Sequence, residues 1–379
     1  MEIIFGILFG CLCGIFLGLA PGFNIGLAYI GAVTLPVEPR FAVGTIMGIE
    51  ITYSALSHLN LLNSKHRDDL DDHVKIANKE ELCLTSINGY MFSKILLTWT
   101  LAFVIFTGPN SLDLGKFTQE ASLVIAVTLW IIMLQKSKHW KIATIALIGF
   151  SLLTIFTVEL PIKQPMFILV SALYSSNLIN NVRYKQEKIV LNNIKAPSDL
   201  QLEGMFAGFI SGLLWGLPTS AFCSAMKSVK KERANTTVNR KAVADGATSV
   251  VGITLLMASG SAKTAAASSA ATFNIQFHYT EIIILLIVQL GLSLLIYWNW
   301  RSLMQVYAWI NNHTPHFFHI LTVIITVISL TIMSNGYFWL IALTALMLNK
   351  LIKQAEAPKE LSLVCISILP VLAILSKAF

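Results

Sequence analysis

Charged residues are scarce in this 379-residue chain. Asp, Glu, Lys and Arg make up 12% of it, whereas 55% of the residues are hydrophobic and the mean hydropathy is +0.70. A soluble globular domain carries about 25% charged residues. The shortage therefore excludes a separate soluble domain of any size and indicates a polytopic membrane protein, which we expect to be all-α.

Signatures of enzymes and metal sites are also lacking. No G-x-S-x-G, Walker A or HExxH pattern occurs, and the five cysteines show neither a disulfide framework nor zinc-ligand spacing. The acidic run around Asp68–Asp72 matches no calcium or zinc pattern and is typical of a solvated loop. We expect no enzymatic activity, no metal and no cofactor apart from a coupling Na⁺ or H⁺.

Basic residues are not scarce, because Lys and Arg number 27 against 20 acidic residues and give a net charge of +7. They lie between apolar windows rather than in one patch, which argues against nucleic acid as a partner. The N-terminus carries Glu2 where a signal peptide has a basic region, so no cleaved signal peptide is expected.

Fourteen apolar windows cover the chain in two groups of seven. They fall at about 2–20, 22–38, 42–62, 91–107, 121–135, 142–158 and 165–180, and then at 204–217, 218–226, 243–260, 280–300, 317–333, 336–350 and 361–376. The polar stretch 181–202 separates the groups as a connector. We thus predict a first membrane repeat at 1–180 and a second at 203–379.

The distribution of basic residues predicts the orientation. Six alternate loops hold 21 of the 27 Lys and Arg residues and should face the cytoplasm: 63–90, 136–141, 181–203, 227–241, 301–316 and 350–360. Only Arg40, Lys116, Lys163, Lys263 and Lys377 fall on the opposite side. We place Lys94 at the cytoplasmic end of the span 91–107, and we interpret the basic run 227–241 as an anchor that meets anionic headgroups.

This orientation makes the second repeat upside down. Residues 2–38 begin and end outside, whereas 204–226 begin and end inside, and five further spans follow each segment. Each half is then a proline-broken hairpin plus about five transmembrane helices, which is an inverted-topology repeat. The first hairpin is long enough to be either re-entrant or fully spanning.

Glycines spaced four residues apart open both halves. Gly6, Gly10, Gly14 and Gly18 precede Pro21, and Gly204, Gly208, Gly212 and Gly216 precede Pro218, 198 residues later. Such spacing places the glycines on one ridge of a helix, where a second backbone can approach closely. Proline then ends the helix within an apolar stretch.

The first glycine run continues as GCLCGIFLGLAPGFNIGLAYIGAVTLPVEP, and the second reads EGMFAGFISGLLWGLPTS. Both resemble the glycine-rich segments of the TctA family, the large membrane subunits of tripartite tricarboxylate transporters, and a short archaeal-type branch is closest. Thr219 departs from the family pattern, which has glycine after the second proline. The resemblance implies uptake of a carboxylate, and as further partners a small membrane subunit and an extracytoplasmic solute-binding protein.

The two proline breaks are the predicted solute site. Backbone N–H groups freed at a helix end attract an anion, and neighbouring side chains add donors. This hypothesis assigns solute binding to Pro21, Gly22, Phe23, Asn24, Pro218, Thr219 and Ser220. The alternative is that the breaks are structural kinks.

Ionisable residues inside apolar windows are the next candidates, because burial in a membrane is costly. Glu50, with Thr52 and Ser54, is predicted to couple an ion, and Asp245 is its counterpart in the second half. Lys263, in a segment of small and hydroxyl residues, is predicted to neutralise an anionic solute. Each residue also has a structural alternative. Glu50 could be a carboxylate paired with a helix terminus, Asp245 could lie at the cytoplasmic interface, and Lys263 could lie in a loop on the outer surface.

Together these features predict an ion-gradient-driven secondary transporter of a small anionic solute, located as a multi-pass protein in the cell (inner or cytoplasmic) membrane. We expect the protein to contact the lipid bilayer and to be able to form a homo-oligomer. The alternatives are a polyprenyl- or lipid-phosphate translocase and a structural membrane protein that does not transport.

Overall fold

The computed structural model describes most of the chain. The described residues are 2–19, 37–62, 79–107, 114–162, 165–174, 189, 191, 202–213, 219–220, 222–223, 234–259, 273, 275, 279–369 and 372. All regular structure in them is helical, as predicted. The chain divides into two compact units, and each unit takes segments from both halves of the sequence.

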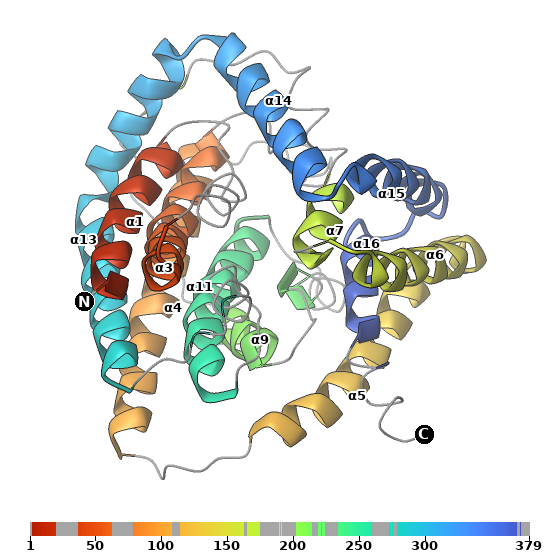
Figure 1. The fold of residues 1–379 in the computed structure, drawn as a ribbon, viewed down its shortest axis with the longest axis horizontal. Coiled ribbons are helices and arrows are strands. Elements are labelled where there is room, and N and C mark those ends of the chain that lie inside the picture. The colour runs from red at the N-terminus through yellow and green to blue at the C-terminus, as the bar shows by residue number, and fades with distance from the viewer. Residues whose placement is uncertain are drawn as a thin grey trace. The chain divides into compact units, whose positions relative to one another are not determined.

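The first unit comprises Met1–Leu112, Lys185–Leu213 and Glu232–His319. Its elements are α1 (Glu2–Leu19), α3 (Pro39–Leu56), the short 3₁₀ helix η1 (Ser57–Leu62), α4 (Lys79–Thr107), α9 (Leu202–Leu213), α11 (Ala234–Ser259) and α13 (Tyr279–His313). Figure 1 shows α1 and α3 side by side, with α13 and α4 next to them.

The second unit comprises Asp113–Tyr184, Leu214–Lys231 and Ile320–Phe379. Its elements are α5 (Leu114–Gln135), α6 (Trp140–Glu159), α7 (Pro165–Leu173), most of α14 (His316–Met333), α15 (Tyr337–Gln354), α16 (Leu361–Val364) and the 3₁₀ turn η3 (Cys365–Ser367). The Trp130 indole on α5 donates to the Ser367 hydroxyl at 2.7 Å, which ties η3 to α5.

Several windows predicted from hydropathy coincide with helices that could cross a membrane. Among the described residues, three helical segments have the required length and apolar composition: Glu2–Leu19, Trp140–Glu159 and Ile283–His313. Ile320–Met333 and Tyr337–Gln354 pass the same test as a pair that bends by 114° at a short break. The number of spans beyond these stays a prediction.

Some predicted boundaries were wrong. Helix α13 continues to His313, so residues 301–313 are not a loop, and its 35 residues make it about 52 Å long. Helix α4 begins at Lys79 rather than near residue 91. The window 361–376 begins with only four residues of α-helix, followed by the 3₁₀ turn.

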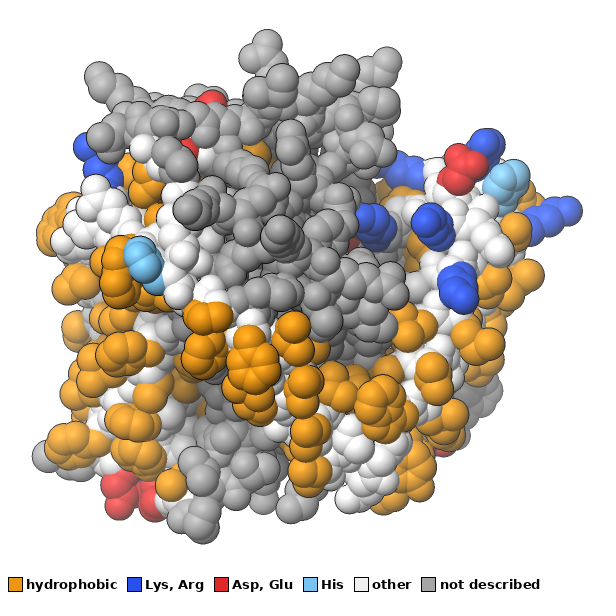
Figure 2. Space-filling view, turned by 90° about the horizontal axis from the view of Figure 1, so that it is seen from above, with side chains coloured by type: hydrophobic (Ala, Val, Ile, Leu, Met, Phe, Trp, Pro, Cys, Tyr) orange, Lys and Arg blue, Asp and Glu red, His pale blue; other side chains and the backbone are white. Residues whose placement is uncertain are grey.

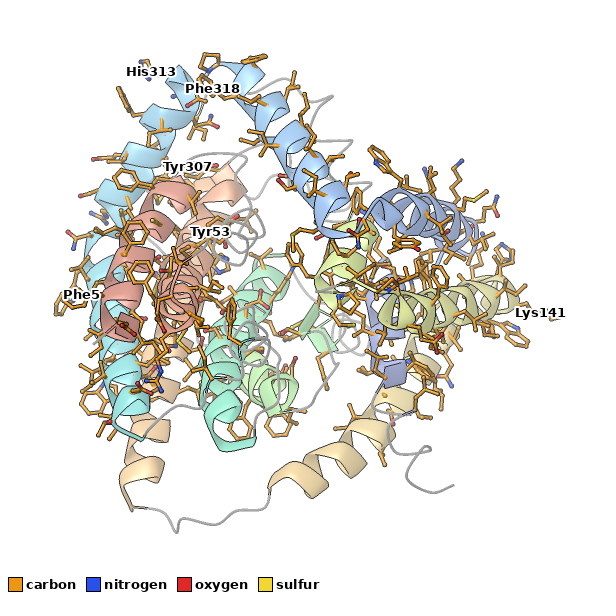
Figure 3. All side chains as sticks on the ribbon, in the orientation of Figure 1. Phe5, Tyr53, Lys141, Tyr307, His313 and Phe318 are labelled. Carbon is orange, nitrogen blue, oxygen red and sulfur yellow. The ribbon has the colours of Figure 1, made fainter. Side chains whose placement is uncertain are left out.

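Apolar side chains point outward along most helices. On α1 the exposed side chains include Phe5, Leu8, Phe9, Leu12 and Phe16, and Phe5 points away from α3 (Figure 3). Hydrophobic side chains also spread over much of the face in Figure 2. Apolar helices with such surfaces identify a helical protein that associates with a membrane.

An ion pair outside the apolar helices joins the loops before α6 and after α15. The Lys138 ammonium lies 2.9 Å from the Glu356 carboxylate, and this hydrogen bond holds the pKa of Glu356 below its ordinary value. A lowered carboxyl pKa contributes stability at neutral pH that is lost as the pH falls through the lowered value. Both side chains are exposed, so the contribution is small.

Glycine allows the closest helix contacts in the first unit. A β-carbon at Gly10 would collide with the Thr45 carbonyl oxygen of α3, and one at Gly208 would collide with the Ala244 carbonyl oxygen of α11. The backbones of these helices therefore touch directly. Side chains larger than hydrogen cannot fit there without a shift of the helices.

The two glycine helices make equivalent contacts. On the first pair of helices, Gly6 contacts Phe41, Gly10 contacts Thr45, and Gly14 contacts Ile49 and Thr52. On the second pair, in the same order, Gly204 contacts Arg240, Gly208 contacts Ala244, and Gly212 contacts Thr248 and Val251. The offset is 198 residues on the glycine helices and 199 on their partners. The α1–α3 pair thus recurs as the α9–α11 pair.

Contacts along each pair give the direction of its helices. Gly6 meets Phe41 and Gly18 meets Leu56, so α1 and α3 run parallel. The same progression from Gly204 to Gly212 makes α9 parallel to α11. Parallel packing requires the chain to return from one end of each pair to the other before the second helix begins.

Helix α4 relates the two pairs to each other. Lys94 contacts Ile51, and the earlier residue Ser86 contacts His58, so α4 is antiparallel to α3. A β-carbon on Gly89 would meet Asn239, and one on Gly246 would meet Ser93 of α4, so α4 is parallel to α11. The α1–α3 pair and the α9–α11 pair therefore run in opposite directions.

We expect Gly10→Ala to destabilise the protein by about 1–3 kcal/mol, because the added methyl group overpacks the backbone contact with Thr45. The matched control is Gly291→Ala on α13, where an added β-carbon has nothing within 4 Å and helix propensity improves. Thermal unfolding in detergent compares the two variants. Equal midpoints would show that the α1–α3 contact does not require glycine.

Candidate functional site

Half of the twelve residues predicted for solute or ion binding lie outside the described residues. These are Pro21, Gly22, Phe23, Asn24, Pro218 and Lys263. Thr219 and Ser220 are described, and both are half-buried in a short helical segment of the second unit. Glu50, Thr52, Ser54 and Asp245 all belong to the first unit, which therefore contains the best-described part of the predicted site.

Thr52 has a structural environment. Its side chain is fully buried, and its hydroxyl lies 2.9 Å from the Gly48 carbonyl oxygen and 3.3 Å from the Cys11 carbonyl oxygen. These contacts close the α1–α3 interface next to Gly14. Because the hydroxyl already serves backbone carbonyls, Thr52 is a weak candidate for an ion ligand.

Glu50 and Asp245 are both half-buried, on α3 and α11. The 199-residue offset between these helices places Ser249, rather than Asp245, at the position equivalent to Glu50. Asp245 lies about one helical turn earlier, because a turn contains 3.6 residues. The two carboxylates are thus near-equivalents and not strict counterparts.

The buried charge that sequence reasoning missed is Lys94. It is only 1% exposed and lies near the middle of α4, which begins twelve residues before the predicted window, so Lys94 is not at a helix end as expected. Its place on the cytoplasmic side stays a prediction. A lysine inside a membrane costs about 2.5–3.5 kcal/mol on insertion scales, and such residues are usually functional.

Neutral groups surround the Lys94 ammonium. Its nitrogen donates to the Ile51 carbonyl oxygen at 3.3 Å and to the Tyr90 hydroxyl at 3.2 Å. The same nitrogen lies 5.1 Å from the centre of the Tyr90 ring. No carboxylate among the described residues forms an ion pair with it. Its positive charge is therefore available to an anion.

Lys94 lies at the same level along the helices as both carboxylates. Its acceptor Ile51 follows Glu50 on α3, and Gly246, which packs on Ser93, follows Asp245 on α11. We call this layer of the first unit the central level, and define it by Glu50, Lys94 and Asp245. A positive and two acidic side chains from three helices thus occupy one level of a largely apolar unit.

A second set of polar contacts continues from Tyr90 toward the start of α4. The His58 ring lies 4.8 Å from the Tyr90 ring, and its Nδ1 atom lies 2.8 Å from the Ser86 hydroxyl. Tyr307 of α13 is fully buried in the same cluster, and Figure 3 shows it and Tyr53 on neighbouring helices. These contacts fix the Tyr90 ring, which in turn positions the Lys94 ammonium.

Helix α13 brings buried polar side chains near the central level. Gln289 is 0% exposed and Ser293 is 2% exposed. In the part of the chain that the structure describes, neither the nitrogen nor the oxygen of the Gln289 side-chain amide has a hydrogen-bond partner. An unpaired buried amide costs about 1–3 kcal/mol. The sequence did not indicate that Gln289 is buried, because it is a single polar residue within an apolar window.

The basic run 227–241 contains a residue that does not face headgroups. Arg240 is 1% exposed, and its guanidinium lies 3.1 Å from the Glu203 carboxylate of α9. This ion pair joins the first residues of the α9–α11 pair. The anchor interpretation was therefore wrong for Arg240, and it stays a prediction for the residues before α11.

A metal site has no support in the part of the chain that the structure describes. No group of three His, Cys, Asp or Glu side chains there could hold a metal ion. The central level carries one ammonium group and two carboxylates, and the hydrogen-bond partners of the Lys94 ammonium are neutral, so an anion could bind at Lys94 and a cation at a carboxylate.

The chain matches no protein-family model, no curated protein and no solved structure. The resemblance to the TctA family therefore rests on the glycine-rich motifs alone and stays a prediction.

We expect Lys94→Met to leave the thermal unfolding midpoint unchanged or to raise it. Replacing a buried charge by an apolar side chain of similar volume is often neutral or stabilising, by about 1–4 kcal/mol. Lys141→Met, on the exposed start of α6, is the matched control and should change the midpoint little. A large loss of stability in Lys94→Met alone would assign the ammonium a structural role instead.

Proposed function

We propose that this protein is a secondary transporter that moves a small anionic solute across a cell membrane and is driven by an ion gradient. The observation that carries the proposal is the buried Lys94 ammonium, which contacts only neutral groups among the described residues. A membrane protein that retains such a charge gains nothing in stability from it. An anion that enters the first unit would supply the missing negative charge.

The proposed architecture is an inverted-topology repeat in which each half begins with a proline-broken hairpin. It is supported by the recurrence of the α1–α3 contacts in the α9–α11 pair and by the opposite directions of the two pairs. Secondary transporters built on such repeats bind their solutes near the membrane midplane, at discontinuous helices. The central level lies about two-thirds of the way along α3 and near the middle of α11, so it lies away from the ends of both helices.

The coupling ion is proposed to bind at Glu50 or Asp245. Both carboxylates lie at the level of Lys94, so an ion bound to either would alter the electrostatic field at the anion. Na⁺ and H⁺ are both compatible with carboxylate ligands. That the solute is a carboxylate follows only from the family resemblance. Phosphate is the alternative, because it could bind to the Lys94 ammonium in the same way.

Uptake into proteoliposomes tests the transport proposal. We expect gradient-dependent uptake of at least one anion from a panel of mono-, di- and tricarboxylates and phosphate, and none of a neutral sugar. Lys94→Met should abolish uptake, because it removes the charge that binds the anion, whereas Lys141→Met should retain it. Flux that is absent for every anion would favour a structural protein, and movement of short-chain lipid phosphates would favour a translocase.

Cysteine labelling tests the inverted topology. We expect Lys163→Cys and Arg233→Cys to be labelled from opposite sides of the membrane, since the basic loops place residue 163 outside and residue 233 inside. Four of the five native cysteines are buried, so Cys13 is the main source of background and is replaced by serine. Labelling of both sites from one side would contradict the inverted repeat.

A further inference from the structure

We infer that Gln289 contacts the transported solute and recognises a neutral hydrogen-bonding group that the solute carries beside its negative charge. This inference rests on the proposed transport function and extends it from the charge of the solute to a second chemical group. It begins from the Gln289 amide, which is fully buried and whose polar atoms pair with none of the described residues. Unpaired buried polar groups are rare in native proteins and require an explanation.

The level of Gln289 follows from two contacts of α13. Glu281 at the start of α13 bonds to Arg40 at the start of α3, at 2.9 Å. Tyr307, near the end of α13, belongs to the same buried cluster as Leu56 at the end of α3 and Cys83 near the start of α4. Helix α13 therefore runs parallel to α3 and antiparallel to α4.

Counting from the Arg40–Glu281 contact places Lys94 opposite the middle of α13. Ile51, which accepts the Lys94 hydrogen bond, lies eleven residues after Arg40. The same step along α13 leads from Glu281 to residue 292. Ile296, about one turn later, shares a buried cluster with Tyr90 and Met91, which lie about one turn before Lys94 on α4. Gln289 lies three residues before residue 292, which is about 4.5 Å along the helix.

Gln289 also faces the protein rather than the lipid. It is buried on the side of α13 that carries Leu285, Leu286, Ser293 and Ile296, while Ile287 and Leu295 are exposed. The helices that pack on α13 include α4 and α3, which carry Lys94 and Glu50. The amide is thus on the side of α13 that faces the helices of the central level.

The chemistry of the amide defines what it can recognise. It offers two N–H donors and one carbonyl acceptor, so it can bind a hydroxyl group as donor and acceptor at once. Lys94 supplies the positive charge that attracts the anion. The neutral amide of Gln289 adds hydrogen bonds whose geometry depends on the orientation of the solute. A solute with a negative group at Lys94 and a hydroxyl group about one turn away satisfies both side chains.

Pairs of anions that differ by one hydroxyl group test the inference. The probes are malate and succinate, and lactate and propionate, because each pair has the same charge and nearly the same size. We expect the native protein to transport the hydroxylated member with a KM about tenfold lower, and Gln289→Leu to lose this preference. Gln289→Leu should unfold at the same temperature or higher, since it removes an unpaired buried amide.

Two further variants complete the experiment. Gln354→Leu, on the exposed last turn of α15, is the matched control and should keep the preference for the hydroxylated anion. Gln289→Met repeats the measurement with an unbranched side chain if the leucine variant expresses poorly.

The outcomes separate this inference from the proposed function. Uptake that requires Lys94 but shows no hydroxyl preference, or a preference that survives both Gln289 variants, overturns the role of Gln289 and leaves anion transport standing. Absence of uptake for all four probes and for every other anion in the panel overturns the transport proposal itself. A loss of stability in both Gln289 variants would show that the amide is structural.

Discussion

Direct contact between helix backbones is the constraint on which the first unit depends. Gly10 lies against the Thr45 carbonyl oxygen and Gly208 against the Ala244 carbonyl oxygen, with no side chain between the helices. In a membrane, helices gain little from burying apolar side chains, because lipid is equally apolar, and close packing supplies the attraction instead. The glycine ridges therefore hold α1 on α3 and α9 on α11, and they fix the level of every residue on those helices.

The polar side chains of the central level are stabilised poorly by their surroundings. Among the described residues, the Lys94 ammonium has two long hydrogen bonds to neutral acceptors, and the side-chain amide of Gln289, on α13 near this level, has none. Helices this apolar would be more stable with leucine or methionine at both positions. Features that lower stability and lie together in the middle of a packed unit are typical of binding sites, where affinity for a ligand offsets the loss.

Much of the fold could be predicted from the sequence, because hydropathy and glycine spacing are local signals. The helical class and the pairing of a glycine ridge with a second backbone were confirmed. Helix ends were predicted poorly at α4 and α13, where amphipathic turns continue a helix beyond its apolar window. Hydropathy averages treat such turns as loops, because they measure lipid exposure and not burial against protein.

The candidate site was harder to predict for the same reason. Glu50 and Asp245 were found because an acidic residue in an apolar window is conspicuous, but their register depended on the 199-residue offset that only the packing shows. Lys94 lay at the edge of a window, and Gln289 is uncharged. Both residues are distinguished by burial. Among the described residues, Lys94 also lacks a carboxylate partner and the Gln289 amide lacks a hydrogen-bond partner. These properties belong to the tertiary structure.

The proposed function places a limit on how the protein can move. Alternating access requires parts of the protein to move against each other around the solute. The glycine contacts cannot slide without a collision of backbone atoms, so each parallel pair must move as one body. Helix α4 contacts α3 through Lys94 and η1 through Ser86, whereas it packs on α11 at Gly89 and Gly246. The interface with α3 is made by side chains, which can exchange partners. Movement between α4 and the α1–α3 pair would therefore change the contacts of Lys94, and this links the position of the helices to the charge that holds the anion.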